Sequence, residues 1–272
     1  MTNTEMSTHG RDKHEELPFN LTDLDREVLS QTDEEFVCHD WAEMRKIVAT
    51  NSLEALKRKP SDLVRYIKWS SKTKAEYGSV GNYIGQRRLQ WFPITTTNAT
   101  ATTTIGTSNP SSTSSSPAAT GTTPLTTPTI SPSPTPNSHT PLSFKNPIPF
   151  ADPDDYRILR NDWPYGFTPD IVHLVVWLKT PIETDPVTGV ITEASHALID
   201  KFVKWKFVER LRRLQEDKDK SDTDDVSDRV LWCKNWTALQ SVRSLEHIHV
   251  FVRNVPDEVI VEWTGDKGLV QG

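Results

Sequence analysis

One uncharged stretch limits what this chain can fold into. Residues 95–141 contain 17 Thr, 9 Ser and 8 Pro, and none of these 47 residues is Lys, Arg, Asp or Glu. So few apolar side chains cannot offset the entropy cost of ordering the backbone. We therefore predict a disordered insertion, which acts as a spacer or, alternatively, as a phosphorylation platform. The second reading rests on the residues that precede a proline: Ser116, Thr123, Thr127, Ser131, Ser133, Thr135 and Thr140.

Further segments lie outside the predicted core. Residues 1–18 form a polar, disordered tail, and residues 264–272 form a second tail. Residues 216–228 carry seven acids and two lysines, but no register supplies both the Gly and the Glu that a calcium-binding EF-hand loop needs. We predict a solvated acidic loop there. The remaining parts, 19–94 and 142–263, suffice for one domain with two lobes.

The first part, 19–94, has helical patterns. The signature "TDEE" (32–35) is typical of a capping box, and an apolar stripe follows it at helical spacing: Val37, Trp41, Met44 and Val48. Pro60 is typical of the first position of a second helix. We therefore predict a helical N-terminal lobe.

The second part, 142–263, mixes two kinds of element. Residues 171–179 are an apolar, β-branched run of strand length, and 229–236, 247–253 and 258–263 are read as further strands. Residues 192–215 predict one long amphipathic helix with an apolar stripe made by Leu198, Phe202, Trp205 and Val208. The predicted fold class is α+β, with a mostly antiparallel sheet in this lobe.

Charge and composition limit the classes of partner that the chain can have. The formal net charge of −6 argues against a general nucleic-acid binder, and no apolar run approaches the roughly 18 residues of a membrane helix. The N-terminus lacks the apolar core of a secretory signal. The two cysteines, Cys38 and Cys233, have no metal-site spacing. We expect a cytoplasmic protein, with the nucleus as a further location; the cofactor and protein partners stay open.

Three long motifs point to a family. They are "HDWAEMRKIVATNSLEALKRKPSDLVRYIKW" (39–69), "NDWPYGFTPDIVHLVVWLKTPI" (161–182) and "VLWCKNWTALQSVRSLEHIHVFV" (230–252). Together they resemble a fungal family of unknown function that is named after an N-acetylglucosamine-induced protein. The resemblance covers both lobes and implies a link to the aminosugar response. It implies no reaction.

Two histidines are the candidate working groups. In a strand over 247–253, His247, His249 and Phe251 share one face, and Ile248, Val250 and Val252 share the other. The second face is the predicted core face. We therefore expect the histidines to be available to a cleft or to solvent.

The order of elements around this strand is similar to the histidine-triad superfamily, in which a histidine attacks the phosphorus of a nucleotide. The resemblance implies His249 as the nucleophile and His247 as the first histidine of the motif. It also matches Asn235 and Ser241 to the Asn and Ser of the family's phosphate site. Positive charge for the phosphate can come from Lys234, Arg243 and Arg253. The chemistry needs a neutral imidazole whose far nitrogen is held by a backbone carbonyl. The chain departs from the pattern at Phe251 and Thr237, and it has three extra residues between Val242 and His247.

Several readings of the site stay open. Trp163 and Tyr165, on the rigid "DWPYGF" turn, can stack on a sugar or base or can simply plug the core. His173 or Glu246 could join the histidines at a metal, although no metal site is predicted. The leading hypothesis is a response or binding protein of aminosugar metabolism that binds a sugar phosphate or nucleotide. The alternatives are a divergent nucleotide phosphoester enzyme and an interaction protein regulated through 95–141.

Overall fold

The structure is a computed structural model that describes residues 21–93, 142–218, 225–236 and 239–266. The predicted tail 1–18 and the predicted insertion 95–141 lie outside these ranges. So do residues 219–224 of the predicted acidic loop and most of the tail 264–272. All described residues belong to one folded unit.

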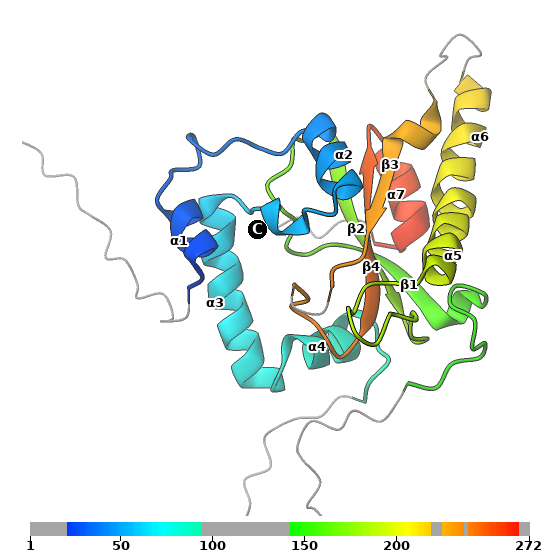
Figure 1. Cartoon of the computed structure of the whole chain (residues 1–272), viewed down its shortest axis with the longest axis horizontal. Helices are drawn as coiled ribbons and strands as arrows, with labels where there is room; N and C mark the ends of the chain where they lie inside the picture. Colours follow the sequence, from blue (N-terminus) through cyan, green and yellow to red (C-terminus); the bar gives the residue numbers. More distant parts are fainter. Residues whose placement is uncertain (1–20, 94–141, 219–224, 237–238, 267–272) are drawn as a thin grey trace, which may run out of the picture. The chain divides into compact units, whose positions relative to one another are not determined.

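An antiparallel sheet organises the described residues (Figure 1). Its four strands are β1 (Tyr156–Arg160), β2 (Ile171–Leu178), β3 (Val230–Cys233) and β4 (Glu246–Arg253), in the order β1-β2-β4-β3. Every pair of neighbouring strands is antiparallel. The predicted α+β class is therefore confirmed, and β1 is a strand that the sequence patterns did not reveal.

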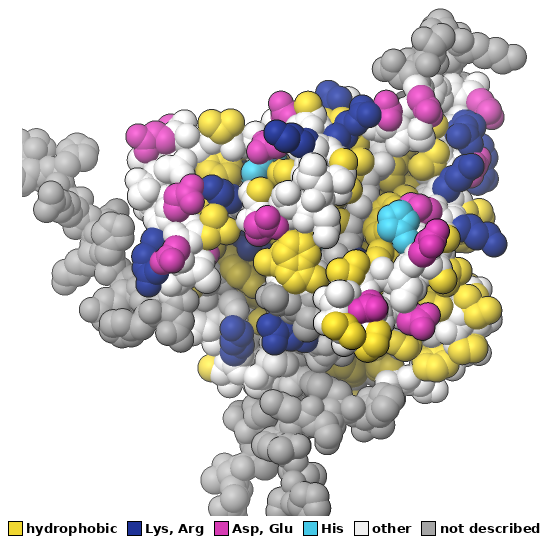
Figure 2. Space-filling view, in the orientation of Figure 1, with side chains coloured by type: hydrophobic (Ala, Val, Ile, Leu, Met, Phe, Trp, Pro, Cys, Tyr) yellow, Lys and Arg dark blue, Asp and Glu magenta, His cyan; other side chains and the backbone are white. Residues whose placement is uncertain are grey.

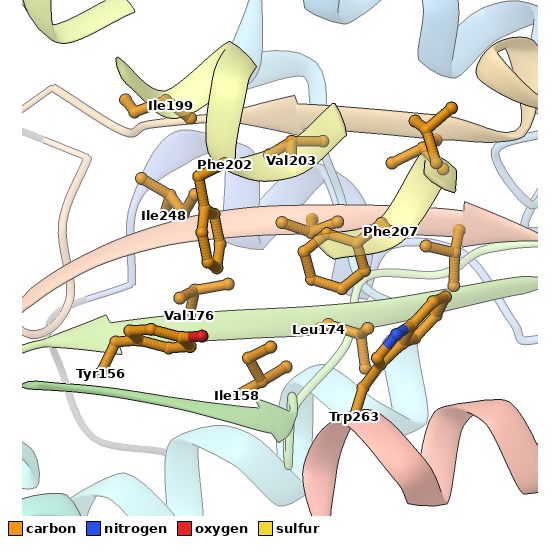
Figure 3. Close-up of a cluster of buried hydrophobic side chains, with 14 of the residues drawn as sticks. Tyr156, Ile158, Leu174, Val176, Ile199, Phe202, Val203, Phe207, Ile248 and Trp263 are labelled. Atoms are coloured by element: carbon orange, nitrogen blue, oxygen red, sulfur yellow. The ribbon is translucent and has the colours of Figure 1, made fainter. Parts of the chain in front are cut away.

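One face of the sheet carries the largest apolar core. Helices α5 (Glu193–Val203) and α6 (Glu209–Lys218), joined by the π-helical turn η4 (Lys204–Val208), pack on this face together with α7 (Asp257–Thr264). Figure 3 shows the interlocked side chains. The strands contribute Ile158, Leu174, Val176 and Ile248, and the helices contribute Ile199, Phe202, Val203, Phe207 and Trp263.

The N-terminal helices cover the opposite face. They are α1 (Asp23–Leu29), α2 (Trp41–Ala49), α3 (Pro60–Tyr77) and α4 (Val80–Tyr83), with the short turns η1 (Leu53–Ala55) and η2 (Ile84–Arg88). Side chains of α2 pack against Phe251 and Cys233, and those around α4 pack against Val175 and Trp177. Two short turns, η3 (Pro153–Asp155) and η5 (Val226–Arg229), precede β1 and β3. The sheet is thus covered on both faces.

The predicted capping box forms but starts no helix. The Thr32 backbone N–H donates to the Glu35 carboxylate at 2.9 Å, and the Glu35 N–H donates to Thr32 Oγ1 at 3.3 Å. The bonds close a turn, and α2 begins only at Trp41, where the Asp40 carboxylate caps it. Val37, predicted to lie on the apolar stripe, is 82% exposed. The capping bonds therefore form, but no helix follows them because the next residues have no core to pack against.

The long helix is confirmed, but its predicted stripe is wrong at one position. Trp205 is 57% exposed, whereas Phe207 is fully buried. The cause is η4, in which a π-helical turn takes in one residue more than an α-helical turn. The helix therefore buries Phe202 and Val203 before the π-helical turn and Phe207 and Val208 at the end of that turn.

Two other expectations are corrected. The run 258–263 is helical, within α7, because Val259, Ile260 and Trp263 face the core at helical spacing. A short apolar run does not by itself distinguish strand from helix. The predicted acidic loop is shorter than 216–228, since α6 continues to Lys218 and η5 begins at Val226, which is buried. No helix among the described residues is long and apolar enough to cross a membrane.

Candidate functional site

A cavity of about 140 Å³ lies between the sheet and the N-terminal helices. Six of the residues predicted for the site line it: Trp163, Tyr165, Asn235, Ser241, His247 and His249. Its other walls include Tyr66 and Trp69 from α3, Trp177 from β2 and the side chains of Arg58 and Arg88. The sequence motifs 39–69, 161–182 and 230–252 therefore meet at one place.

The histidines are buried rather than solvent-facing. His247 is 5% exposed and His249 is 8% exposed. The predicted alternation is right, because Ile248, Val250 and Val252 form the core face of β4. Of the two expected alternatives, a cleft or solvent, the cleft is the one that the structure shows, because β4 is a central strand whose second face is covered by the helical part. The histidines face the cavity.

His249 has both ring nitrogens engaged by protein groups. The Asn235 side-chain amide lies 3.2 Å from His249 Nε2, and His173 Nε2 lies 2.9 Å from His249 Nδ1. If the amide donates to Nε2, Nδ1 carries the proton and donates to His173. The Gln240 side chain fixes Asn235 by donating to its backbone carbonyl at 2.7 Å. His249 is therefore held in a side-chain network.

His247 is held differently. Its Nδ1 lies 2.9 Å from the Leu245 carbonyl, to which it donates, and its ring lies 4.7 Å from that of Trp177. No described residue makes a hydrogen bond to its Nε2, which is left as an acceptor lone pair. A backbone carbonyl that fixes the tautomer is the feature that the sequence argument required of a nucleophile. This feature occurs at His247 and not at His249.

Burial keeps all three histidines neutral. It lowers the pKa of His173 to about 3 and holds the pKa of His249 well below its ordinary value. It also lowers the pKa of His247. The physical cause is the loss of the water that would solvate an imidazolium, and nearby positive charge at Arg58 and Lys234 acts in the same direction.

Arg58 is the main site residue that the sequence patterns missed. Its guanidinium donates to the Trp163 carbonyl at 3.1 Å and lies over the rings of Tyr66 at 4.2 Å and Tyr165 at 5.1 Å. No carboxylate in the described part of the chain lies within ion-pair distance of it. Arginine has no positional signature in a helix-connecting segment, so only the family motif 39–69 could have drawn attention to it.

The other cations near the cavity are paired. Lys234 Nζ lies 2.8 Å from Glu246, and its side chain is only 6% exposed. Arg88 Nη2 bonds to Asp162 at 2.8 Å and to Asp266 at 3.1 Å. Both cations have their charge offset within the protein. Lys234 does not line the cavity, although it was predicted to bind the ligand.

Of the remaining predicted residues, two line the cavity and two lie away from it. Tyr165 stacks on His173 with ring centroids 5.5 Å apart, and Trp163 packs 5.2 Å from Trp69. These two aromatics build the wall of the cavity as well as filling the core. Arg243 is exposed and lines no part of the cavity. Arg253 pairs with Asp170 at 2.8 Å at the other end of β4.

A metal reading finds no support in the geometry. Within the ranges that the structure describes, no group of three or more His, Cys, Asp or Glu side chains is arranged to hold a metal ion. His173 does join the histidines, through its contact with His249. Glu246 points instead to Lys234.

The surface gives no sign of a polyanion-binding face on the side seen in Figure 2. Acidic and basic side chains are interspersed there rather than gathered by sign. The unpaired charge of Arg58 is therefore a feature of the cavity and not of a wide basic surface.

Comparisons with known proteins match most of the chain. Residues 40–253 match the family described as Protein of unknown function (DUF3605). The N-acetylglucosamine-induced protein 1 of Candida albicans is 24% identical over 234 residues, which are 85% of this chain and 74% of that protein. The uncharacterized protein YPL067C of Saccharomyces cerevisiae is 31% identical over 103 residues, which are 38% of this chain and 46% of that protein.

One solved structure is also similar. It is described as the crystal structure of HTC1, is 21% identical, and aligns with 80% of this chain and 86% of its own with a TM-score of 0.48. The family matches span the same motifs from which the family resemblance was drawn.

Proposed function

The chain belongs to the family described as Protein of unknown function (DUF3605), as its motifs predicted, and we propose that it binds a small phosphorylated ligand, a sugar phosphate or a nucleotide. The observation that carries the proposal is Arg58. Its cation lies at the cavity between Tyr66 and Tyr165 and has no carboxylate partner among the described residues. A partly buried, unpaired guanidinium is well suited to bind the oxygens of a phosphate.

The size of the cavity favours a monosaccharide over a whole nucleotide. At about 140 Å³ it is close to the roughly 150 Å³ of an engineered protein cavity that takes up one benzene molecule. The ring of one sugar would occupy it, and the substituents of that ring would extend through its open side. Tyr66, Trp69 and Trp163 supply flat apolar walls, of the kind against which the faces of sugar rings pack.

The aminosugar role is part of the same proposal. The Candida albicans relative is named for its induction by N-acetylglucosamine. Phosphorylated aminosugars are therefore the first compounds to test. We propose a binding or response protein in aminosugar metabolism, located in the cytoplasm and also in the nucleus.

The test is a calorimetric titration with N-acetylglucosamine 6-phosphate, beside unphosphorylated N-acetylglucosamine and uridine and adenosine nucleotides. We expect saturable binding of the phosphorylated sugar. Arg58→Gln should weaken it by about 10- to 100-fold, because a hydrogen bond to a charged group contributes roughly 1.5–3 kcal/mol. The matched control is Arg243→Gln, which removes an exposed arginine outside the cavity and should leave the affinity unchanged.

Two results would contradict the proposal. One is the absence of binding by every phosphorylated compound at millimolar concentration. The other is an Arg58→Gln protein that binds as tightly as the wild type.

A second candidate, a divergent phosphoester hydrolase or transferase, is favoured by the state of His247. A neutral imidazole with Nδ1 held by a carbonyl and Nε2 open to a cavity suits nucleophilic attack on phosphorus. Release of nucleoside monophosphate from dinucleotides would be measured for His247→Gln and His249→Gln. If this reading is right, His247→Gln abolishes turnover and His249→Gln leaves a measurable fraction. Turnover that survives in His247→Gln excludes it.

The third reading, an interaction protein regulated through 95–141, rests on residues that lie outside the described ranges. It stays a prediction.

A further inference from the structure

We infer that the ligand lies in a set direction across the cavity, with its phosphate at Arg58 and a sugar hydroxyl donating to His247 Nε2. On this reading His247 is the residue that selects a hydroxylated ring over other small anions. The inference rests on the proposed function, because it assigns the two ends of the same cavity.

The first step is that the two groups lie at different ends of a row of rings. Arg58 lies over Tyr165, and Tyr165 stacks on His173. His249 stands between His173 and His247, with ring centroids 5.1 Å from His173 and 5.3 Å from His247. In the sheet, Trp177 is the partner of His247 and Val175 that of His249, so the row follows β4. Arg58 and His247 are thus separated along this row by the rings of Tyr165, His173 and His249.

The second step is that His247 Nε2 can accept a hydrogen bond from a group that is not part of the protein. The Leu245 carbonyl takes the proton of Nδ1, so Nε2 has only a lone pair to offer. This atom is not one of the fully buried unpaired atoms among the described residues, and His247 lines the cavity, so a group in the cavity can reach it. Lys234, the residue that follows β3, is held by Glu246 at 2.8 Å. A ligand hydroxyl is the group that would complete the bond.

The third step excludes the reverse direction. A phosphate oxygen and the Nε2 lone pair are both acceptors and repel each other, while Lys234 already has its charge offset by Glu246. The charges also differ along the row. Beyond burial, which is the main cause, Arg58 adds to the lowering of the pKa at His173 and His249, whereas the charges acting on His247 are Glu246 and Lys234. The anionic end is therefore the Arg58 end.

The experiment separates the two ends with two probes. Inorganic phosphate and N-acetylglucosamine 6-phosphate are titrated into the full-length wild type and into Arg58→Gln, His247→Leu and His247→Gln proteins. We expect Arg58→Gln to lose affinity for both probes. His247→Leu should lower the affinity for the sugar phosphate at least about tenfold, while the affinity for inorganic phosphate stays within about twofold of the wild-type value. His247→Gln should restore most of the loss, because its side chain carries an acceptor near the position of Nε2.

A second measurement covers the case in which His247→Leu does not fold. Monodeoxy analogues of the sugar phosphate are titrated into the wild type. One of them should lose the same affinity, because it lacks the hydroxyl that donates to His247. Equal weakening of both probes by the Leu variant, or equal affinity for all deoxy analogues, overturns the inference. If neither probe binds the wild type, both the proposed function and this inference are wrong. If Arg58→Gln weakens the binding of both probes while the His247 variants change neither affinity, only the assigned direction of the ligand is wrong.

Discussion

His173 lies beside the cavity residue His249 and is itself buried. Its ring lies between Tyr165, at 5.5 Å, and Phe251, at 4.6 Å, and burial lowers its pKa from 6.5 to about 3. No carboxylate among the described residues pairs with it, so a proton on it would be a buried charge without a described partner. The neutral state of His173 is therefore a condition of the fold as well as of the site.

This condition predicts how stability depends on pH. In the unfolded chain each histidine takes up a proton near its ordinary pKa of about 6.5, whereas burial lowers the pKa values of His173, His247 and His249 in the folded chain. The unfolded state therefore binds more protons as the pH falls below about 6.5. We expect the free energy of unfolding to be nearly constant above pH 7 and to fall at lower pH by up to about 1.4 kcal/mol per pH unit for each histidine.

Urea unfolding measured at intervals between pH 7.5 and 5.5 checks this expectation. His173→Gln removes one of the titrating groups and should make the slope against pH shallower by about a third. The comparison variant is His196→Gln, which removes a histidine that is 55% exposed on α5, pairs with Asp200 and lines no part of this cavity. A slope that is the same in His173→Gln and wild type would contradict the assigned burial.

At the scale of elements, the turn η4 sets the register of the long helix. Upstream of it, Ile199, Phe202 and Val203 face the sheet, and downstream Phe207, Val208 and Leu211 do so. A regular α-helix through this region would turn the second set away from the sheet by about 100°. The one extra residue of the π-turn keeps both sets on the same face, at the cost of exposing Trp205.

This account predicts the effect of a single deletion. Removing Trp205 should convert η4 into ordinary α-helix and leave both buried sets facing the sheet. We expect the free energy of unfolding to change by about 1 kcal/mol or less, because the lost side chain is 57% exposed.

Deleting Ala197 is the matched control. It lies in the regular helix α5, so its loss rotates everything downstream and should cost several kcal/mol or prevent folding. Chemical unfolding of the two proteins compares them directly. If both deletions are equally damaging, η4 does not set the register.

At the scale of the whole chain, the fold accommodates a long insertion because both of its ends join one cluster. Trp91 and Phe92, before it, and Leu142, after it, pack against the same group of buried residues, which includes Val175 and Trp177. The chain can therefore leave and re-enter the folded unit at one place. The cavity is built from both sides of this break, since α3 precedes the insertion and the sheet follows it.

Much of the fold could be predicted because it depends on local pattern. The strand at 171–178, the helix that starts at Pro60 and the long helix all follow from apolar periodicity and helix-start signals. The same signals failed where they are ambiguous. The apolar run in α7 is too short to have a readable period, and the turn at Thr32 has correct capping but no core beside it.

The sequence by itself determined the family, the α+β class and the histidine-bearing strand, because these are carried by residues close together in the chain. Only the tertiary structure decided what the histidines do. Burial by the N-terminal helices removes their water and makes them neutral, and the partners of each ring come from distant segments, as His173 and Asn235 do for His249. The unpaired charge of Arg58 is likewise a property of the packed molecule. Pairing and desolvation depend on which segments meet in space, and no local pattern records that.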